Sequence, residues 1–178
     1  YDNLDSIVFN NLKVEIKKNQ KIGIVGKSGS GKTTFLNLLM GFLSPLEGNI
    51  LVDGKNIEKA LDSWRSKIAF VSQSSYLLDD TVIRNITFEE SKSKIDINLL
   101  NKSILMAGLK NFTDKLPFGL DTKIGERGSK ISGGEILRIA LARAFYSDKE
   151  IYILDEFTSA LDYEKEEEIL ENLDKLNK

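Results

Sequence analysis

The stretch Gly26-Lys-Ser-Gly-Ser-Gly-Lys32-Thr33 has the GxxxxGK[ST] spacing of a phosphate-binding loop. An apolar run, Ile22–Val25, precedes it and a helical pattern, Lys32–Phe42, follows it, which is the strand-loop-helix context that the motif requires. Its glycines let consecutive backbone N–H groups approach phosphate oxygens without Cβ clashes, and the following helix N-terminus adds the positive end of its dipole. The stretch therefore predicts an α/β fold that holds a nucleotide at this loop.

Each position of this loop has an expected role. The Lys32 ammonium would neutralise the β and γ phosphates, and the Thr33 hydroxyl would bind Mg²⁺, which also bridges the phosphates. The phosphate contacts are expected from Ser28, Gly29, Ser30, Gly31, Lys32, Thr33 and Thr34. A glycine-rich turn without a ligand is the alternative, but the flanking strand and helix patterns argue against it.

Sequence on both sides of the loop extends the α/β pattern. Three short apolar runs are typical of buried parallel strands: Ile22–Val25, Ile68–Val71 and Ile151–Leu154. Helical patterns lie between them: Lys32–Phe42, Asn98–Gly108 and Glu135–Tyr146. Gly48–Gly54 instead predicts a strand closed by an Asp-Gly turn, so we expect an antiparallel element beside a mostly parallel sheet.

Composition limits the chemistry. The 178 residues, 41% of them apolar, suit one domain, and 25 basic against 27 acidic residues argue against nucleic-acid binding. The chain has no cysteine and no histidine, which excludes disulfides, thiolate metal sites and an imidazole base. A catalytic base must therefore be a carboxylate or a lysine.

No apolar run approaches the roughly 18 to 20 residues that span a bilayer, so the sequence predicts a soluble domain. The chain opens at Tyr1 directly in polar sequence, without a signal peptide or an initiator Met. We expect it to be a segment of a longer protein, whose membrane helices could lie upstream.

The second motif is the apolar run Ile151–Leu154 followed by Asp155 and Glu156. At the carboxyl end of a strand, Asp155 can reach Mg²⁺ directly or through water, and Glu156 can polarise an attacking water. Alone, an apolar strand that ends in two carboxylates is common. Together with the phosphate loop it makes Glu156 the best candidate for the base.

The segment Ile131-Ser-Gly-Gly-Glu135 indicates which class of nucleotide-binding protein the chain resembles. It resembles the signature of ABC-type ATPases, usually written LSGGQ, and continues as that family does through Arg138–Ala144. The resemblance implies that Ser132, Gly133, Gly134 and Glu135 contact ATP held by the phosphate loop of a second domain. A helix capped by Ser132 after a glycine turn is the plainer alternative.

The resemblance implies a P-loop NTPase fold over residues 1–178, with a mostly parallel central sheet and an N-terminal antiparallel β subdomain. A helical subdomain at roughly 75–145 would carry the signature loop. Tyr1 would stack on adenine, and Gln73 would match the Q-loop glutamine, which contacts Mg²⁺ and the attacking water. Ser159–Asp162 resembles the D-loop that couples two such sites.

Two further segments favour an exporter or flippase subtype. Asp79–Ile86 resembles the stretch that follows the Q-loop in exporters, and Thr122–Gly128 resembles their X-loop, with Lys123 in place of an acidic residue. The resemblance implies a transmembrane domain as partner and a second nucleotide-binding domain in a head-to-tail dimer. It places the domain at the cytoplasmic face of a membrane, the bacterial inner membrane being favoured.

The C-terminal end departs from the family. Tyr163–Lys178 predicts a helix with Ile169, Leu170, Leu173 and Leu176 facing inward, and no switch histidine follows it. An incomplete domain with weak hydrolysis and limited stability is therefore expected. An ATP-binding dimerisation module with little hydrolysis, or an ABC ATPase that does not serve transport, remains as an alternative.

Overall fold

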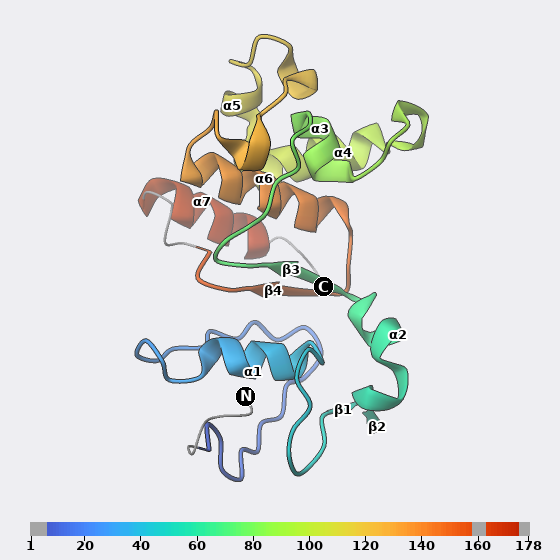
Figure 1. Cartoon of the computed structure of the whole chain (residues 1–178), viewed down its shortest axis with the longest axis vertical. Coiled ribbons are helices and arrows are strands. Elements are labelled where there is room, and N and C mark those ends of the chain that lie inside the picture. The colour runs from blue at the N-terminus through green and yellow to red at the C-terminus, as the bar shows by residue number, and fades with distance from the viewer. Residues whose placement is uncertain (1–6, 158–162, 175–178) are drawn as a thin grey trace. The chain divides into compact units, whose positions relative to one another are not determined.

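The computed structural model describes residues 7–157 and 163–174. Its backbone contacts divide the chain into two compact units, residues 1–67 and residues 68–177, whose elements are labelled in Figure 1. Each unit has a two-stranded sheet, antiparallel in the first and parallel in the second. The predicted α/β class is confirmed.

The first unit contains short elements after a long irregular segment. In chain order they are helix α1 (Lys32–Leu39), strands β1 (Leu51–Val52) and β2 (Lys55–Asn56), the 3₁₀ turn η1 (Ile57–Ala60) and helix α2 (Leu61–Arg65). Helix α1 begins at the predicted residue and ends three residues before Phe42. Its C-terminal carbonyls are taken up by side chains, since Trp64 Nε1 donates to Leu39 O at 2.7 Å.

The antiparallel element predicted at Gly48–Gly54 is present as the β1-β2 hairpin, with Leu51 opposite Asn56 and Val52 opposite Lys55. Asp53 and Gly54 form the turn and both have positive φ, 49° and 76°. A two-residue turn with both central residues at positive φ matches the right-handed twist of the strands, which is why Asp-Gly is favoured there.

The strand predicted at Ile22–Val25 is wrong for this structure. Residues 7–31 form neither helix nor strand, and Val25 is 96% exposed. A strand exists only where its N–H and C=O groups pair with a neighbour, and an apolar run does not by itself supply one. Strands β3 and β4, the other two predicted members of the sheet, pair with each other in the second unit.

The second unit is built on these two strands, β3 (Ile68–Val71) and β4 (Ile151–Leu154), both with the predicted bounds. They pair in parallel, with Ile68 beside Ile151 and Val71 beside Leu154. A hydrogen bond from Asp155 N to Val71 O, 2.9 Å long, continues the ladder one residue beyond β4. The carboxyl ends of both strands therefore lie at the same edge.

Helices pack around this strand pair within the second unit. They are α3 (Val82–Thr87), α4 (Ile97–Met106), α5 (Lys110–Thr113), α6 (Gly133–Tyr146) and α7 (Tyr163–Asp174), with 3₁₀ turns η2 (Lys92–Lys94), η3 (Gly119–Asp121) and η4 (Glu126–Gly128). Helices α4 and α6 confirm the helical patterns predicted at Asn98–Gly108 and Glu135–Tyr146, with ends shifted by one or two residues. The N-cap side chains of Thr81, Asp96 and Ser132 each accept a hydrogen bond from the first turn of α3, α4 and α6.

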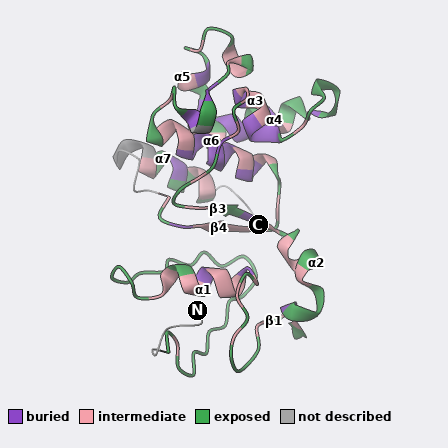
Figure 2. Cartoon of the chain, in the orientation of Figure 1, coloured by how far each residue is buried: buried purple, intermediate pink, exposed green. Residues whose placement is uncertain are grey.

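Helix α6 is the centre of the core. Ile139, Leu141 and Ala142 are fully buried on it, and it packs on α3, α4 and β3 (Figure 2). Helix α7 adds Ile169, which is 1% exposed, whereas Leu170 is 43% exposed. The prediction that Leu170 faces inward is therefore wrong, because a residue one position after a buried one is turned by about 100° around a helix.

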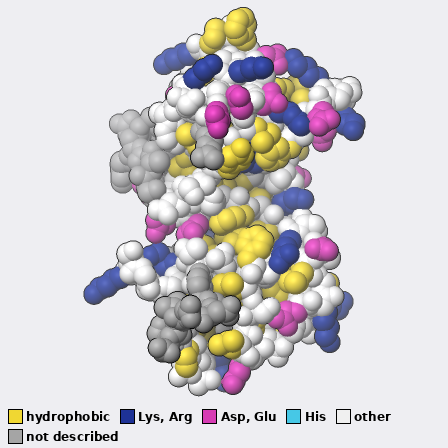
Figure 3. Space-filling model, viewed as in Figure 1, with side chains coloured by type: hydrophobic (Ala, Val, Ile, Leu, Met, Phe, Trp, Pro, Cys, Tyr) yellow, Lys and Arg dark blue, Asp and Glu magenta, His cyan; other side chains and the backbone are white. Residues whose placement is uncertain are grey.

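Lysine, arginine and acidic side chains are interspersed over the face shown in Figure 3, in keeping with the nearly balanced charge of the sequence. Among the described residues, no helix has the length and apolar character that crossing a membrane requires.

Candidate functional site

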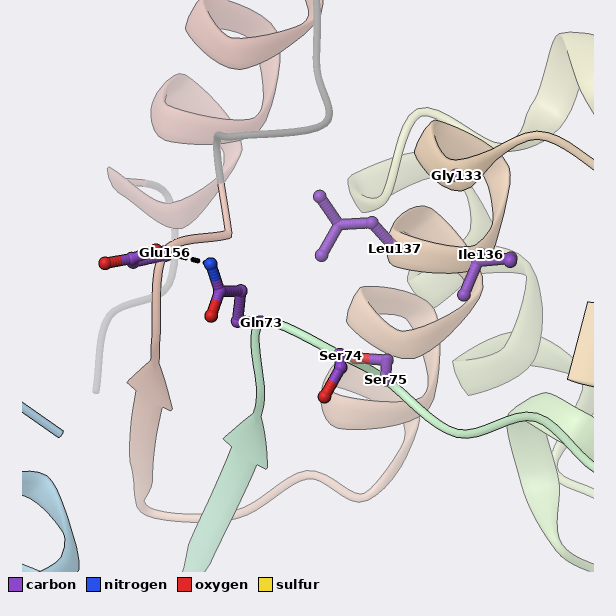
Figure 4. A pocket seen from close by; sticks show the side chains of 7 residues that line it. All are labelled: Gln73, Ser74, Ser75, Gly133, Ile136, Leu137 and Glu156. Carbon is purple, nitrogen blue, oxygen red and sulfur yellow. Dashed lines mark hydrogen bonds between the residues drawn. The ribbon is translucent and has the colours of Figure 1, made fainter.

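A cavity of about 240 Å³ lies in the second unit, at the carboxyl ends of β3 and β4. Its lining comes from three segments: Gln73, Ser74 and Ser75 after β3, Gly133, Ile136 and Leu137 on α6, and Glu156 after β4 (Figure 4). The cavity thus brings together the predicted Q-loop glutamine, the predicted base and the first turns of the helix that follows the signature segment.

Gln73 and Glu156 form the polar end of this cavity. Gln73 Nε2 donates to Glu156 Oε2 over 2.6 Å. The parallel register explains the contact, because Val71 pairs with Leu154 and so Gln73 and Glu156 each stand two residues beyond the paired ends. The amide oxygen of Gln73 points away from Glu156 (Figure 4), so it can ligate a cation or accept a hydrogen bond from water.

Asp155 and Glu156 are adjacent in sequence but differ in burial and in backbone conformation. Asp155 is buried, 9% exposed, whereas Glu156 is exposed and has a positive φ of 48°. A left-handed conformation in a residue with a Cβ destabilises the backbone by on the order of 1–3 kcal/mol and is concentrated at functional sites. The turn directs two consecutive carboxylates into different environments.

The signature segment is held by a capping box at the start of α6. Ser132 Oγ accepts from Glu135 N at 3.3 Å, and Glu135 Oε2 accepts from Ser132 N at 2.7 Å and from Ser132 Oγ at 2.8 Å. The plainer alternative, that Ser132 caps a helix, is thus present in the structure. Gly133 and Gly134 occupy the first turn of α6, where backbone N–H groups have no helical acceptor.

Two apolar residues, Ile136 and Leu137, follow Glu135 on α6. Leu137 is 5% exposed, and Ile136 packs partly buried against the core. Both side chains therefore contribute to the packing of α6. Both also give the cavity an apolar wall.

The phosphate loop belongs to the first unit, where Ser28, Ser30 and Thr33 are exposed. Gly29 and Gly31 have φ of 77° and 91°, which favours glycine, and a Cβ on Gly26 would fall 2.4 Å from Ser30 Oγ, so a side chain there would displace the Ser30 hydroxyl. Lys32 Nζ donates to Gly26 O at 3.0 Å and to Lys27 O at 3.2 Å, which folds the lysine over its own loop.

Gly31 is the N-cap of α1 and has no side chain that could cap the helix. The N-cap residue therefore supplies no side-chain acceptor to the first turn of α1. The N-terminus of a helix attracts phosphate oxygens through its first-turn N–H groups and through the helix dipole. Both features of an anion site are present in this loop.

The predicted site residues are thus divided between the units. Ser28 to Thr34 lie in the first unit, and Gln73, Ser132 to Glu135, Asp155 and Glu156 lie in the second. Tyr1 and the D-loop segment Ser159–Asp162 lie outside the described residues.

Sequence reasoning missed the two serines that follow Gln73. Ser74 and Ser75 line the cavity beside it, and Ser75 Oγ donates to Ser72 O at 3.0 Å, which tightens the turn. Their position directly after Gln73, just beyond an apolar strand, was the available signal. They add two serines to the lining of this cavity.

Oxygen donors of the kind that magnesium prefers occur in both units, Thr33 in the first and Gln73 and Asp155 in the second. These side chains offer a hydroxyl, an amide oxygen and a carboxylate, and hard divalent cations prefer oxygen ligands. Mg²⁺ in nucleotide sites is commonly held by one or two protein oxygens together with phosphates and waters.

Comparison with known proteins agrees with the motifs. Residues 9–159 match the family described as "ABC transporter". The chain is 42% identical over 178 residues to the ATP-dependent lipid A-core flippase of Cupriavidus metallidurans, a match that covers 99% of the chain and 30% of that protein. It is 41% identical to the leukotoxin translocation ATP-binding protein LktB of Mannheimia glucosida, over 95% of the chain and 24% of that protein.

Among solved structures, the chain resembles a bacterial Atm1-family ABC exporter with ATP bound. The TM-score is 0.78 at 37% identity, and the match covers 84% of the chain and 26% of that exporter. The chain spans less than a third of the length of each of these proteins. Since the family match covers most of its residues, the chain belongs to the ABC transporter family and corresponds to its ATPase domain.

Proposed function

We propose that the chain binds and hydrolyses ATP to drive transport across a membrane, as the nucleotide-binding domain of an exporter or flippase. The observation that carries the proposal is the 2.6 Å contact between Gln73 and Glu156 at the carboxyl ends of two parallel strands. The names of the relatives, a lipid flippase, a toxin translocator and an exporter, support the transport assignment. They span different cargoes, so no single cargo is proposed.

In this proposal Glu156 is the general base that polarises the attacking water. The chain has no histidine that could take this role. The Gln73 amide holds the Glu156 carboxylate by a charge-assisted hydrogen bond, and its own oxygen remains to orient the water. Phosphoryl transfer depends mainly on positioning and charge stabilisation, which these residues supply together with Lys32.

Thr33, Gln73 and Asp155 would hold Mg²⁺, which when bound neutralises the charge that develops on the phosphates. Ser28, Gly29, Ser30, Gly31 and Thr34 would donate hydrogen bonds to phosphate oxygens, and Tyr1 would stack on adenine.

The signature residues are proposed to act on a second domain. Ser132, Gly133, Gly134 and Glu135 would meet the γ-phosphate of ATP bound to that domain in a head-to-tail dimer, because the N-terminus of α6 favours an anion. A transmembrane domain, on the same or a separate chain, would be the other partner. The proposal places the ATPase at the cytoplasmic face of a membrane, a bacterial inner membrane being favoured.

The test is Glu156→Gln in the full-length protein, measured for ATP binding and for steady-state hydrolysis. Removal of a general base lowers turnover by about 10²- to 10⁴-fold, while nucleotide affinity should change little. Glu171→Gln is the matched control, since Glu171 is exposed on α7. A Glu156→Gln variant that hydrolyses ATP like the parent would contradict the assigned base.

The two alternatives give different results in the same assay. An ATP-binding dimerisation module would bind ATP without measurable turnover even in the unmutated protein. An ABC ATPase without a transport role would hydrolyse ATP at a rate that does not respond to reconstitution in lipid with a transmembrane domain.

A further inference from the structure

Arg143, in the last turn of α6, is bound to a segment that lies far away in sequence. Its Nε donates to Asn85 O at 2.8 Å, its Nη1 donates to Tyr76 O at 3.0 Å, and its Nη2 lies 3.5 Å from Asn85 Oδ1. The guanidinium also stacks on the Phe88 ring, 4.6 Å from its centroid. One side chain thus joins α6 to both ends of the segment 76–85.

Asn85 closes this segment from within. It is fully buried, its Oδ1 accepts from Leu78 N at 2.7 Å, and its Nδ2 donates to Leu78 O at 3.1 Å and to Thr81 O at 3.0 Å. Residues 76–81 form no helix and no strand apart from a single bridge at Thr81. Side chains therefore provide the hydrogen bonds that a regular element would otherwise supply.

The hydrogen bonds of Arg143 and Asn85 lie next to the cavity that Gln73 lines. Tyr76 directly follows Ser75, which lines the cavity together with Gln73. The opposite wall comes from Gly133, Ile136 and Leu137, which stand on the same helix as Arg143. Arg143 therefore lies on the helix that forms one wall of the cavity, and it hydrogen-bonds to Tyr76, the residue that follows the other wall.

A purely structural role would be served more simply by an apolar side chain at position 143. Burial of a guanidinium is unfavourable, and here burial lowers the pKa of Arg143. Only a planar group with several N–H donors can reach two backbone carbonyls and an amide oxygen in fixed directions. The choice of arginine thus indicates that the position of the segment 76–85 relative to α6 is fixed by directed hydrogen bonds.

We propose that Arg143 and Asn85 are a positioning pair, which holds Gln73 in register with Glu156 and with the first turn of α6. The inference rests on the proposed function and adds two residues that stand outside the lining of the cavity. It assigns them to turnover rather than to nucleotide affinity, because the phosphate loop is in the other unit.

The experiment compares Arg143→Lys, Asn85→Ala and the double variant in the full-length protein. Lysine keeps the charge and the stem but cannot reach three acceptors with one ammonium group. Displacement of a catalytic group by about 1 Å lowers turnover by up to about 100-fold, so we expect kcat to fall about 10- to 100-fold and KM for ATP to change less than about threefold. The double variant should be no worse than the poorer single one, since both remove the same connection.

Arg84→Lys is the matched control. Arg84 lies on α3 next to Asn85, and its guanidinium donates hydrogen bonds to Phe88 O and Glu90. Its contact with residues 76–81 is an ion pair with Asp80 at 3.8 Å, and it does not hold the backbone carbonyls of that segment as Arg143 does. The same substitution there should leave kcat unchanged. Hydrogen exchange gives a readout independent of activity, because the Leu78 amide should exchange faster in the Arg143 and Asn85 variants than in the control.

Should Asn85→Ala fail to fold, Arg143→Lys decides the question. A folded Arg143→Lys protein with parental kcat and parental exchange at Leu78 would overturn the inference. Equal losses in ATP binding and turnover would also overturn it, in favour of a general structural role. If the parent shows no hydrolysis, or if Glu156→Gln matches it, the proposed function fails instead, and the exchange at Leu78 still tests the pair.

Discussion

Two adjacent residues of α7 give a sharp test of how this helix packs. The sequence pattern places both Ile169 and Leu170 inward, whereas the structure buries Ile169 to 1% exposure and leaves Leu170 43% exposed. Each is replaced by alanine, which removes the same number of carbon atoms. The difference between the two variants therefore reports burial rather than side-chain size.

The expected magnitudes follow from exposure. Ile169→Ala removes about three buried methylene equivalents at about 0.8 kcal/mol each, and the remaining cavity raises the loss to about 3–4 kcal/mol. In Leu170→Ala nearly half of the residue is already in water and no closed cavity forms, so we expect a loss of about 1–1.5 kcal/mol. The two variants should differ by about 2–3 kcal/mol in the free energy of unfolding.

The assay is urea denaturation followed by far-ultraviolet circular dichroism, analysed by linear extrapolation. With a slope of about 2 kcal/mol/M, the difference corresponds to about 1 M or more between the midpoints. Equal midpoints for the two variants would refute the assignment of the buried face of α7 and would favour the sequence pattern instead.

Three further changes test the remaining elements. Ser132→Ala removes the cap that Glu135 N uses, and urea denaturation should show a loss of about 1 kcal/mol. Gly54→Ala forces a Cβ into a turn position with φ of 76°, so the same measurement should show a loss of about 1–2 kcal/mol. Gly23→Ala is its control and should not lower the stability, because no atom lies within 4 Å of the added Cβ. Lys32→Ala should weaken nucleotide binding by about 10- to 100-fold in titration calorimetry, because a charged hydrogen-bond donor to phosphate is lost, and unchanged affinity would argue against the phosphate loop.

Most local elements could be predicted from the sequence. Strands β3 and β4 have the predicted bounds because each is a short apolar run bounded by polar residues. The β1-β2 turn could be predicted because Asp53 and Gly54 tolerate positive φ. Ile22–Val25 has the same apolar character and forms no strand, since strand formation also requires a paired neighbour.

The candidate site shows the same division between local pattern and long-range contact. The residue types of the phosphate loop, the Ser132 capping box and the Asp155-Glu156 pair all follow from short spacings, because each depends on neighbours in the chain. The contact of Gln73 with Glu156 joins residues 83 apart, and that of Arg143 with Asn85 joins residues 58 apart. Such contacts depend on strand register and on helix packing, which no linear spacing contains. The sequence by itself therefore determined which chemical groups the protein has and the local motifs that carry them, while only the tertiary structure decided which distant groups meet.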